Sequence, residues 1–426
     1  MPFTDIAQLN GLFKEVYGDD IVSLVPSASK FTKIVPFTQK DKENGNFYHQ
    51  PVILSYEHGF TYAAAGAGAF ALNTQIPMAM KDAQIVGSQI VLRSAISYDA
   101  AYRASNGKKA FVETTKLVVD NMMDSMAKRL EIQSFYGQVG IAALSARANI
   151  DTTHTRLTIT LKEWAAGIWA GLETAQIDVF QSNLSTKINT TAALNIDSVD
   201  LVNRQFVVSG IAADITALDT YVNANPDLAT VFFLGANAAG VFQEMAGIKK
   251  ILVNAGTLFN ISAATYTLWK GSTYSSGSAA LTFGKIIDAI AEGSNRGLSE
   301  DVTVFLNPKA WGNIATDQAA LRRYGSNYTP AKSQNGQEAV EFYSQSGKVT
   351  LVPHIFIKEG DAFVLPLKRI MRLGATDITF QRPGRPGDIF LELTGNAGYE
   401  LRLYTDQAVF IETPARSVLV TAIVNG

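Results

Sequence analysis

Four histidines are the side chains of this sequence best suited to acid–base or metal chemistry, and their spacing forms no metal-binding motif. They are His49, His58, His154 and His354. None belongs to an HxxH or HExxH pattern, so the sequence predicts no metal ligand. His49 and His58 fall in a segment with the pattern of a hairpin, where hydrogen bonding across a contact is the simpler interpretation.

Motifs for nucleophiles and cofactors are missing as well. The chain has no cysteine and no G-x-S-x-G elbow, so neither a thiolate nor an activated serine is predicted. Gly66-x-Gly68 resembles the start of a dinucleotide loop, but Ala71 stands in the third glycine position and the strand-to-helix context is missing. Glu300-Asp301 precedes a buried strand and is interpreted as a solvated turn. We therefore predict no catalytic residue, no cofactor-binding residue and no enzyme.

The composition argues against nucleic-acid recognition and membrane insertion. The 426 residues carry a formal net charge of -2 and no basic run longer than pairs such as Lys249-Lys250, so charge-driven binding of nucleic acid is not expected. No apolar run approaches the roughly 18 residues of a membrane-spanning helix. Charged residues make up 17% of the chain, against about 25% in an average soluble protein. Extensive self-association would explain this shortfall, as would a large neutral globular protein.

One long helix is the element around which the other segments are expected to lie. Residues 108–136 contain no proline, and at 1.5 Å per residue a helix over them would be roughly 40–45 Å long. An apolar stripe at three- and four-residue steps gives it one buried face. The stripe consists of Phe111, Thr115, Val118, Met122, Met126 and Leu130. Asn106-Gly107 is placed to begin the helix, and Gly137 to end it in a left-handed cap.

Two segments before this helix are predicted to need a partner surface. Residues 1–37 form an arm without a domain pattern of its own. Residues 38–98 form a long hairpin with strands near 47–56 and 83–98, and Gly87 is a candidate bulge. The small, flexible segment between the strands carries few residues that could build a core. Because an isolated hairpin is only marginally stable in water, its tip is expected to rest on another subunit.

The remainder of the chain predicts separate helices and strands, which is an α+β arrangement. The expected helices cover 162–173, 212–223, 236–250 and 281–292, with a further helix beginning at Asn307-Pro308. The expected strands cover 151–161, 230–234, 302–306, 348–358, 362–367, 377–381, 389–393, 399–404 and 417–424, with a strand-like entry at 266–269.

The order of these segments resembles the Hong Kong 97-like capsid fold of tailed-bacteriophage major capsid proteins. That family has an N-terminal arm, an extended loop, a peripheral domain with a spine helix, and an axial domain. Residues 269–314 are also similar to a pattern met in phage capsid proteins, in which a helix, an acidic turn and a buried strand precede (Asn/Ser)-Pro-(Lys/Arg)-x-Trp. Here that motif is Asn307, Pro308, Lys309, Ala310 and Trp311.

The resemblance implies a domain division and a structural function. It makes 1–37 the arm, 38–98 the extended loop, 99–164 with 371–410 the peripheral domain, and 165–370 with 411–426 an axial domain enlarged around 175–260. It implies a self-assembling icosahedral shell around the genome of a tailed phage. The residues of the loop that it implies as contacts with a neighbouring subunit are His58, Phe60, Tyr62, Phe70 and Leu72.

The implied partners follow from the same resemblance. They are copies of the chain in pentamers and hexamers, portal and scaffold proteins, a decoration protein in some members, and packaged double-stranded DNA held without sequence specificity. The location would be the virion capsid, assembled in the host cytoplasm. Some members crosslink through Lys and Asn, but Lys81 near the base of the loop lies in no motif that carries this chemistry over. An acidic helical leader is absent, which implies a mature form or a separate scaffold protein.

Three other functions stay open at the level of sequence. A compartment shell protein of the encapsulin kind would share the fold and enclose an enzyme cargo. An α+β enzyme would assemble its site from scattered residues and have a deep pocket with shifted pKa values. A tail tube or sheath protein would form helical polymers.

Overall fold

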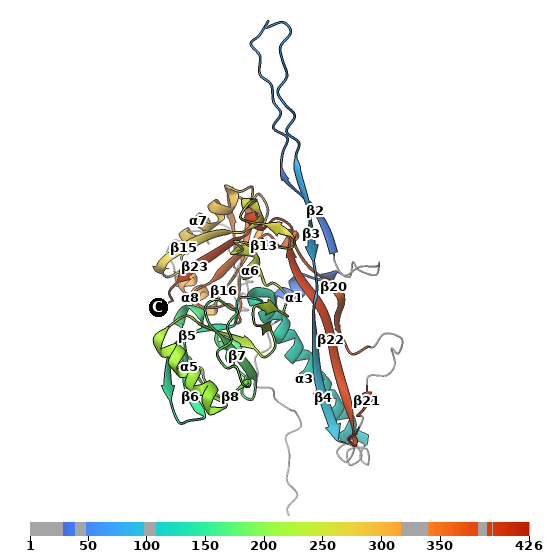
Figure 1. The fold of residues 1–426 in the computed structure, drawn as a ribbon, viewed down its shortest axis with the longest axis vertical. Coiled ribbons are helices and arrows are strands. Elements are labelled where there is room, and N and C mark those ends of the chain that lie inside the picture. Colours follow the sequence, from blue (N-terminus) through green and yellow to red (C-terminus); the bar gives the residue numbers. More distant parts are fainter. Residues whose placement is uncertain are drawn as a thin grey trace, which may run out of the picture.

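A long hairpin projects from a compact body made of several sheets and one long helix (Figure 1). The computed structural model describes residues 29–38, 48–97, 108–316, 340–381, 390–393 and 395–425. Residues 1–28 of the predicted arm and the expected helix start at 106–107 lie outside the described residues.

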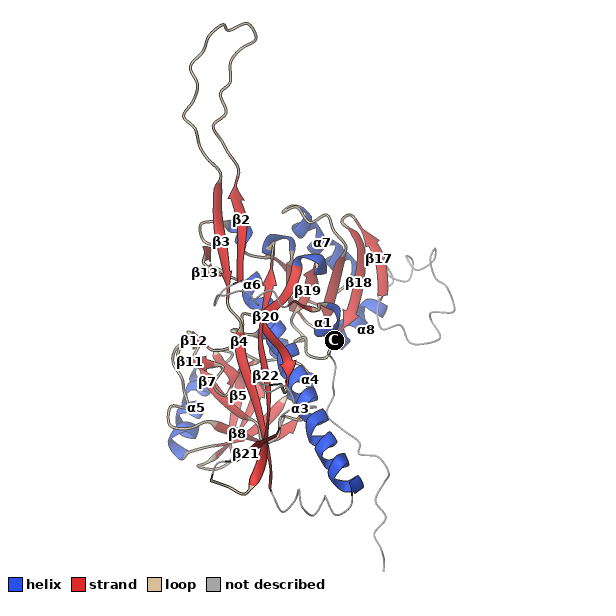
Figure 2. Ribbon diagram, turned by 90° about the vertical axis from the view of Figure 1, so that its right-hand side faces the viewer, coloured by secondary structure: helices blue, strands red, loops and turns tan. Residues whose placement is uncertain are grey.

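The long helix is confirmed with the predicted bounds. α3 covers Lys108–Tyr136 and runs beside strands β4 (Ser88–Ser97) and β22 (Gly398–Ile411) at one side of the body (Figures 1 and 2). Met122, Met126 and Leu130 are buried and Val118 packs against the same core, as the apolar stripe predicts. The side chains of Phe111 and Thr115 lie outside the described residues.

The end of α3 differs from the predicted left-handed glycine cap. Gln138, not Gly137, has the positive φ, at 63°. Gly137 is needed for a different reason: a Cβ on it would lie 2.2 Å from the carbonyl oxygen of Met245 and 3.1 Å from the backbone nitrogen of Gly247. The backbone N–H of Gly247 donates to the carbonyl of Gly137. The glycine therefore lets the segment that leads into α6 (Ile248–Leu252) pack closely against the end of α3.

A sheet beside α3 joins the base of the hairpin to the C-terminal part of the chain. Its strands lie in the order β1-β20-β22-β21, with β4 on the free edge of β22 along most of its length. The strands are β1 (Phe37–Thr38), β4 (Ser88–Ser97), β20 (Ile370–Thr379), β21 (Phe390–Glu392) and β22 (Gly398–Ile411). A four-residue helix, α1 (Phe31–Ile34), precedes β1.

The hairpin itself is built from β2 (Tyr48–Ser55) and β3 (Ala79–Ile85), which pair antiparallel. Beyond Ser55 and Ala79 the two halves of the hairpin continue to the tip without strand pairing. Gly87 is not a bulge within a strand: it lies in the short break between β3 and β4. A Cβ there would lie 1.9 Å from Oδ1 of Asp406, so the glycine lets β22 approach the base of the hairpin.

A closed barrel occupies the lower part of the body in Figure 1. Its strands run β10-β5-β6-β9-β8-β7 around the barrel, and α5 (Ala212–Ala224) packs on β5 and β6. The strands are β5 (Ala142–Asn149), β6 (His154–Ile159), β7 (Gln176–Phe180), β8 (Leu194–Asp200), β9 (Gln205–Ser209) and β10 (Ala229–Phe233). Leu157, Phe206 and Val208 are among its fully buried side chains.

A second mixed sheet carries the C-terminal strand. Its order is β15-β23-β19-β16-β18-β17, with α7 and α8 beside it. These elements are β15 (Ser272–Ala279), α7 (Phe283–Ser294), β16 (Val302–Leu306), α8 (Pro308–Thr316), β17 (Val340–Ser344), β18 (Gly347–Pro353), β19 (Ala362–Leu365) and β23 (Val418–Ile423). The predicted helix before a buried strand and the helix opened by Asn307-Pro308 are both present.

Short elements replace two of the longer ones expected. The helix expected over 236–250 is wrong: β11 (Asn237–Ala238), β12 (Val241–Phe242) and α6 (Ile248–Leu252) stand there. The helix expected over 162–173 is reduced to η2 (Leu161–Glu163) and α4 (Ala166–Trp169). Residues 267–269 form the turn η3 (Thr267–Trp269) instead of a strand. A small hairpin of β13 (Thr257–Leu258) and β14 (Ile261–Ser262), with turns η5 (Leu367–Arg369) and η6 (Pro414–Arg416), completes the elements named here.

The arrangement confirms the predicted α+β class. The barrel strands β5 and β6 precede residue 164, and β7 to β10 follow it, so the barrel crosses the boundary predicted between the peripheral and axial domains. The division into domains stays a prediction.

Candidate functional site

The residues predicted to contact a neighbour lie together on the projecting part of the hairpin (Figures 1 and 2). Phe60, Tyr62, Phe70 and Leu72 all expose half or more of their surface, and Tyr62 is 89% exposed. Tyr56, Ile76 and Met80 on the same projection are exposed as well, although the sequence analysis did not single them out. A run of large exposed apolar side chains marks an interaction surface.

A few hydrogen bonds hold the unpaired part of the hairpin in shape. The backbone N–H of His58 donates to the carbonyl of Ile76 at 3.1 Å. The side chain of Asn73 donates to the carbonyl of Phe60 at 2.8 Å, and its backbone N–H donates to the hydroxyl of Thr61. Below them, the ring of His49 contacts the carboxylate of Asp82 across β2 and β3. These hydrogen bonds thus hold the two halves of the hairpin together, while their apolar side chains stay exposed.

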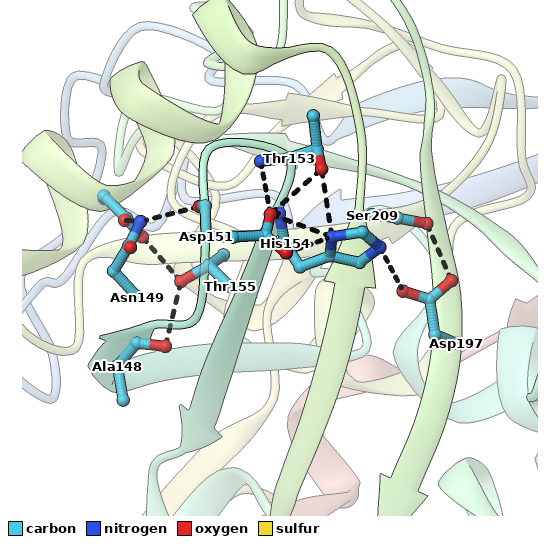
Figure 3. Close-up of polar contacts among 9 residues, drawn as sticks. Ala148, Asn149, Asp151, Thr153, His154, Thr155, Asp197 and Ser209 are labelled. Atoms are coloured by element: carbon cyan, nitrogen blue, oxygen red, sulfur yellow. Dashed lines mark hydrogen bonds and ion pairs between the residues drawn. The ribbon is translucent and has the colours of Figure 1, made fainter.

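His154 belongs to a polar cluster at the end of the barrel (Figure 3). Its Nδ1 lies 2.9 Å from the carboxylate of Asp151, and its Nε2 lies 3.9 Å from Asp197. The hydrogen bond with Asp151 raises the pKa of His154. Ser209 donates to Asp197 at 2.7 Å, whereas a nucleophilic triad needs the serine on the imidazole. The cluster therefore lacks the geometry of a nucleophilic triad.

A second cluster of charges is largely buried where α3, η2, α6 and the loop after β18 meet. Nζ of Lys358 lies 2.5 Å from Glu163, and Nζ of Lys249 lies 2.7 Å from Asp361 and 3.5 Å from Glu163. Although burial alone would raise it, the charges of Lys358 and Lys249 lower the pKa of Glu163 to about 2. Two cations face two anions here, and the ring of Tyr136 lies beneath both lysines. This matched network joins four elements of the fold.

The half-buried Glu300 also differs from the solvated turn predicted for it. Its Oε1 accepts hydrogen bonds from Arg369 at 3.0 Å and from Arg416 at 3.2 Å, so it joins the turns before β20 and β23. Only its neighbour Asp301 is exposed.

A cleft of about 990 Å³ lies between β4, α3 and the barrel. Arg129 stacks on Phe233 there, with 3.2 Å from its guanidinium carbon to the ring centroid. Burial raises the pKa of Glu244 to about 7, against the opposing effects of the Gln138 N–H and the charge of Arg129. Oε1 of Gln133 is buried without a hydrogen-bond partner. This cleft is the feature closest to the pocket with shifted pKa values that an enzyme would have.

No group of three or more His, Asp or Glu side chains in the described part of the chain is arranged to hold a metal ion. None of the helices described is both long and apolar enough to cross a membrane.

Comparison with known proteins identifies the fold through solved structures alone. No protein-family model matches the chain, and no curated protein matches its sequence. The capsid asymmetric unit of cyanophage A-1(L) is similar with a TM-score of 0.57 at 10% identity, covering 99% of both chains. The capsid of an empty GTA particle is similar with a TM-score of 0.52 at 9% identity, covering 99% of this chain and 100% of that one. The chain therefore has the fold of these capsid proteins, and the predicted capsid fold is confirmed.

Proposed function

We propose that this chain, which has the fold of the capsid proteins, is the major capsid protein of a tailed phage and assembles into the icosahedral shell around its genome. One observation carries the proposal: the hairpin extends away from the body and exposes Phe60, Tyr62, Phe70 and Leu72. These side chains cannot reach the core of their own chain, so a neighbouring copy is the natural surface to cover them. On this reading the protein is a structural component and not an enzyme.

Assembly would follow from many modest contacts. Each apolar side chain of the hairpin contributes roughly 25 cal/mol for every Å² that a neighbour covers, less the cost of ordering the contact. A closed shell repeats each contact around its symmetry axes, so individually weak interfaces add to a stable particle. The partners proposed are copies of the chain in pentamers and hexamers, with portal and scaffold proteins, a decoration protein in some particles, and DNA held without sequence specificity.

The proposed location is the virion capsid, with assembly in the host cytoplasm. The formal net charge of -2 suits a container that confines DNA without gripping it. We keep the division into arm, extended loop, peripheral domain and axial domain as part of the proposal. Because the barrel crosses residue 164, the axial domain is better begun at Ala142, the first residue of β5.

Electron microscopy of the protein, expressed alone and with a candidate scaffold protein, tests this function. Closed icosahedral particles or rings of five and six subunits are expected, and nuclease-protected DNA in native particles would separate a genome shell from an enzyme-enclosing compartment. A uniform monomer or dimer under every condition would contradict the proposal, and tubes would point to a tail protein.

Removal of the hairpin tip tests the observation that carries the proposal. Residues 57–75 are replaced by Asn-Gly, which leaves a short loop beyond Ser55 and Ala79, the last residues at which the two strands pair. We expect a folded chain with unchanged circular dichroism that no longer forms stable shells. Normal shells from this variant would show that the hairpin is not the essential contact.

A further inference from the structure

Residues 30–35 pack into a site formed by α3 and its neighbours. The site consists of Glu131 and Phe135 on α3, Phe305 on β16, His354 after β18 and Arg372 on β20, and we call it the arm-binding site. These residues come from four separate elements. They meet the peptide mainly through its backbone and one aromatic side chain.

The carboxylate of Glu131 accepts hydrogen bonds from consecutive backbone N–H groups of the peptide. Its Oε1 accepts from Phe31 at 2.6 Å and from Lys30 at 2.9 Å, and its Oε2 accepts from Thr32 at 3.1 Å. The carboxylate is fully buried. Although burial would raise it, these bonds and that from His354 lower the pKa of Glu131. The arm therefore supplies most of the donors that keep this carboxylate solvated inside the protein.

His354 completes the carboxylate's shell in one tautomer. The backbone N–H of Phe356 donates to Nδ1 of His354, so Nδ1 is an acceptor and the ring proton sits on Nε2. That proton is donated to Oε1 of Glu131 at 2.8 Å. The ring thus acts as a neutral donor, and the negative charge of Glu131 stays directed at the peptide.

Arg372 holds the other end of the peptide. Its Nη1 donates to the carbonyls of Thr32 at 3.0 Å and Val35 at 3.3 Å. Its Nε and Nη2 donate to Gln407 at 3.2 and 2.6 Å, which fixes the guanidinium in place. An anion at one end and a cation at the other match the N–H groups and carbonyls of one turn of backbone.

One aromatic pocket gives the site its selectivity. The ring of Phe31 is fully buried, with its centroid 5.3 Å from that of Phe135 and 6.0 Å from that of Phe305. Val35 is the only other residue of 30–35 that is buried. The entropic cost of ordering the backbone of six residues is opposed by the burial of two apolar side chains and by charge-assisted hydrogen bonds. Because the ordering cost opposes these contacts, removal of Glu131 or of the Phe31 ring should weaken the hold on the segment.

We propose that residues 30–35 are a detachable ligand of the arm-binding site, held by Glu131, Arg372 and the Phe31 pocket. The ligand class is a short peptide with a phenylalanine preceded by a free backbone N–H and followed by a helical turn. Release of the segment would expose Glu131 and the pocket of Phe31 to solvent. This inference is independent of shell formation.

Hydrogen exchange on the full chain tests the hold of Glu131. In Glu131→Gln we expect amide exchange in 30–35 to rise at least tenfold, with exchange in α7 and β16 unchanged. Glu341→Gln is the matched control, since Glu341 lies in an exposed ion pair with Lys348. Unchanged exchange in the segment, or an equal rise throughout the chain, would overturn the proposal.

A peptide added in trans tests whether the ligand is exchangeable. The full chain carrying Phe31→Ala keeps the site but weakens its own segment. A fluorescent peptide of residues 29–36 should bind this variant at least tenfold more tightly than the unaltered chain, measured by anisotropy. The same peptide with alanine in place of Phe31 should not bind either chain. Absence of binding to the variant, or equal binding of both peptides, would show that the segment is a permanent part of the core.

Discussion

Buried charges in this chain differ in whether an opposite charge faces them. Lys358 and Lys249 lie against Glu163 and Asp361, so the network between α3 and the second sheet is close to neutral. Glu244 instead lines a cleft together with Arg129, and burial raises its pKa. The two situations predict different responses to mutation and to pH.

Loss of one member of the matched network should be costly. Lys358→Met leaves Glu163 and Asp361 facing Lys249 alone, and a buried carboxylate without its partner costs about 3–5 kcal/mol. Urea unfolding measures the change. Lys348→Met, which removes the cation of the exposed pair with Glu341, should have little effect. Equal stability of the two variants would mean that the network contributes no more than a surface pair.

Glu244 should make stability fall as the pH rises. Burial raises its pKa from 4.5 to about 7 in the folded chain, so between these values the folded state holds a proton that the unfolded state has released. The free energy of unfolding therefore decreases across this window, by up to about 3 kcal/mol. The difference between the unaltered chain and Glu244→Gln, measured by urea unfolding from pH 4.5 to 8, should shrink and then favour the glutamine. The exposed Glu292→Gln serves as control, and a pH-independent difference for Glu244→Gln would contradict the assignment.

Among the elements, α3 contacts several that lie far apart in the sequence. Its buried stripe contacts the sheet of β4 and β22 along its middle, and its end at Tyr136 meets α6 and the charge network. Because these contacts come from all parts of the chain, the helix is stabilised by packing more than by its own composition.

Truncation on the buried face of α3 should cost far more than truncation on the other face. Leu130→Ala removes a side chain that is 2% exposed and is expected to destabilise the chain by roughly 2–5 kcal/mol. Met123→Ala, on a side chain that is 37% exposed, should cost less than about 1 kcal/mol. Thermal or urea unfolding compares them, and similar losses would mean that α3 has no single buried face.

At the scale of the whole molecule, the body and the hairpin have separate tasks. The body holds the buried clusters of apolar side chains, whereas the projecting hairpin exposes its apolar side chains to solvent. Changes on the hairpin should therefore alter association and leave folding unchanged.

Serine at Phe60, Tyr62, Phe70 and Leu72 together is expected to reduce the yield of shells strongly while the melting temperature stays the same. The reason is that these side chains have little burial to lose within their own chain. Sedimentation and electron microscopy measure assembly. The control keeps an apolar surface with Phe60→Leu, Tyr62→Phe, Phe70→Leu and Leu72→Met, and it should still assemble. Full assembly of the serine variant would exclude these residues as the contact.

Local patterns in the sequence were sufficient for the elements whose stability is largely local. The apolar period of 108–136, the helix before β16 and the helix opened by Asn307-Pro308 were all predictable, because side-chain spacing and capping act within one element. The order of these elements could also be read from residue types along the chain, whereas the contact residues of the hairpin followed only from the resemblance.

Tertiary structure decided what depends on residues far apart. The spacing over 236–250 suits a helix, but Asn237 donates to the carbonyl of Leu184 and Gly240 takes a positive φ of 95°, so the chain turns instead. Glu131 meets His354 across 223 positions, and the barrel closes only when β10 pairs with both β5 and β7. Such contacts depend on which surfaces fold against one another, and no local spacing encodes them.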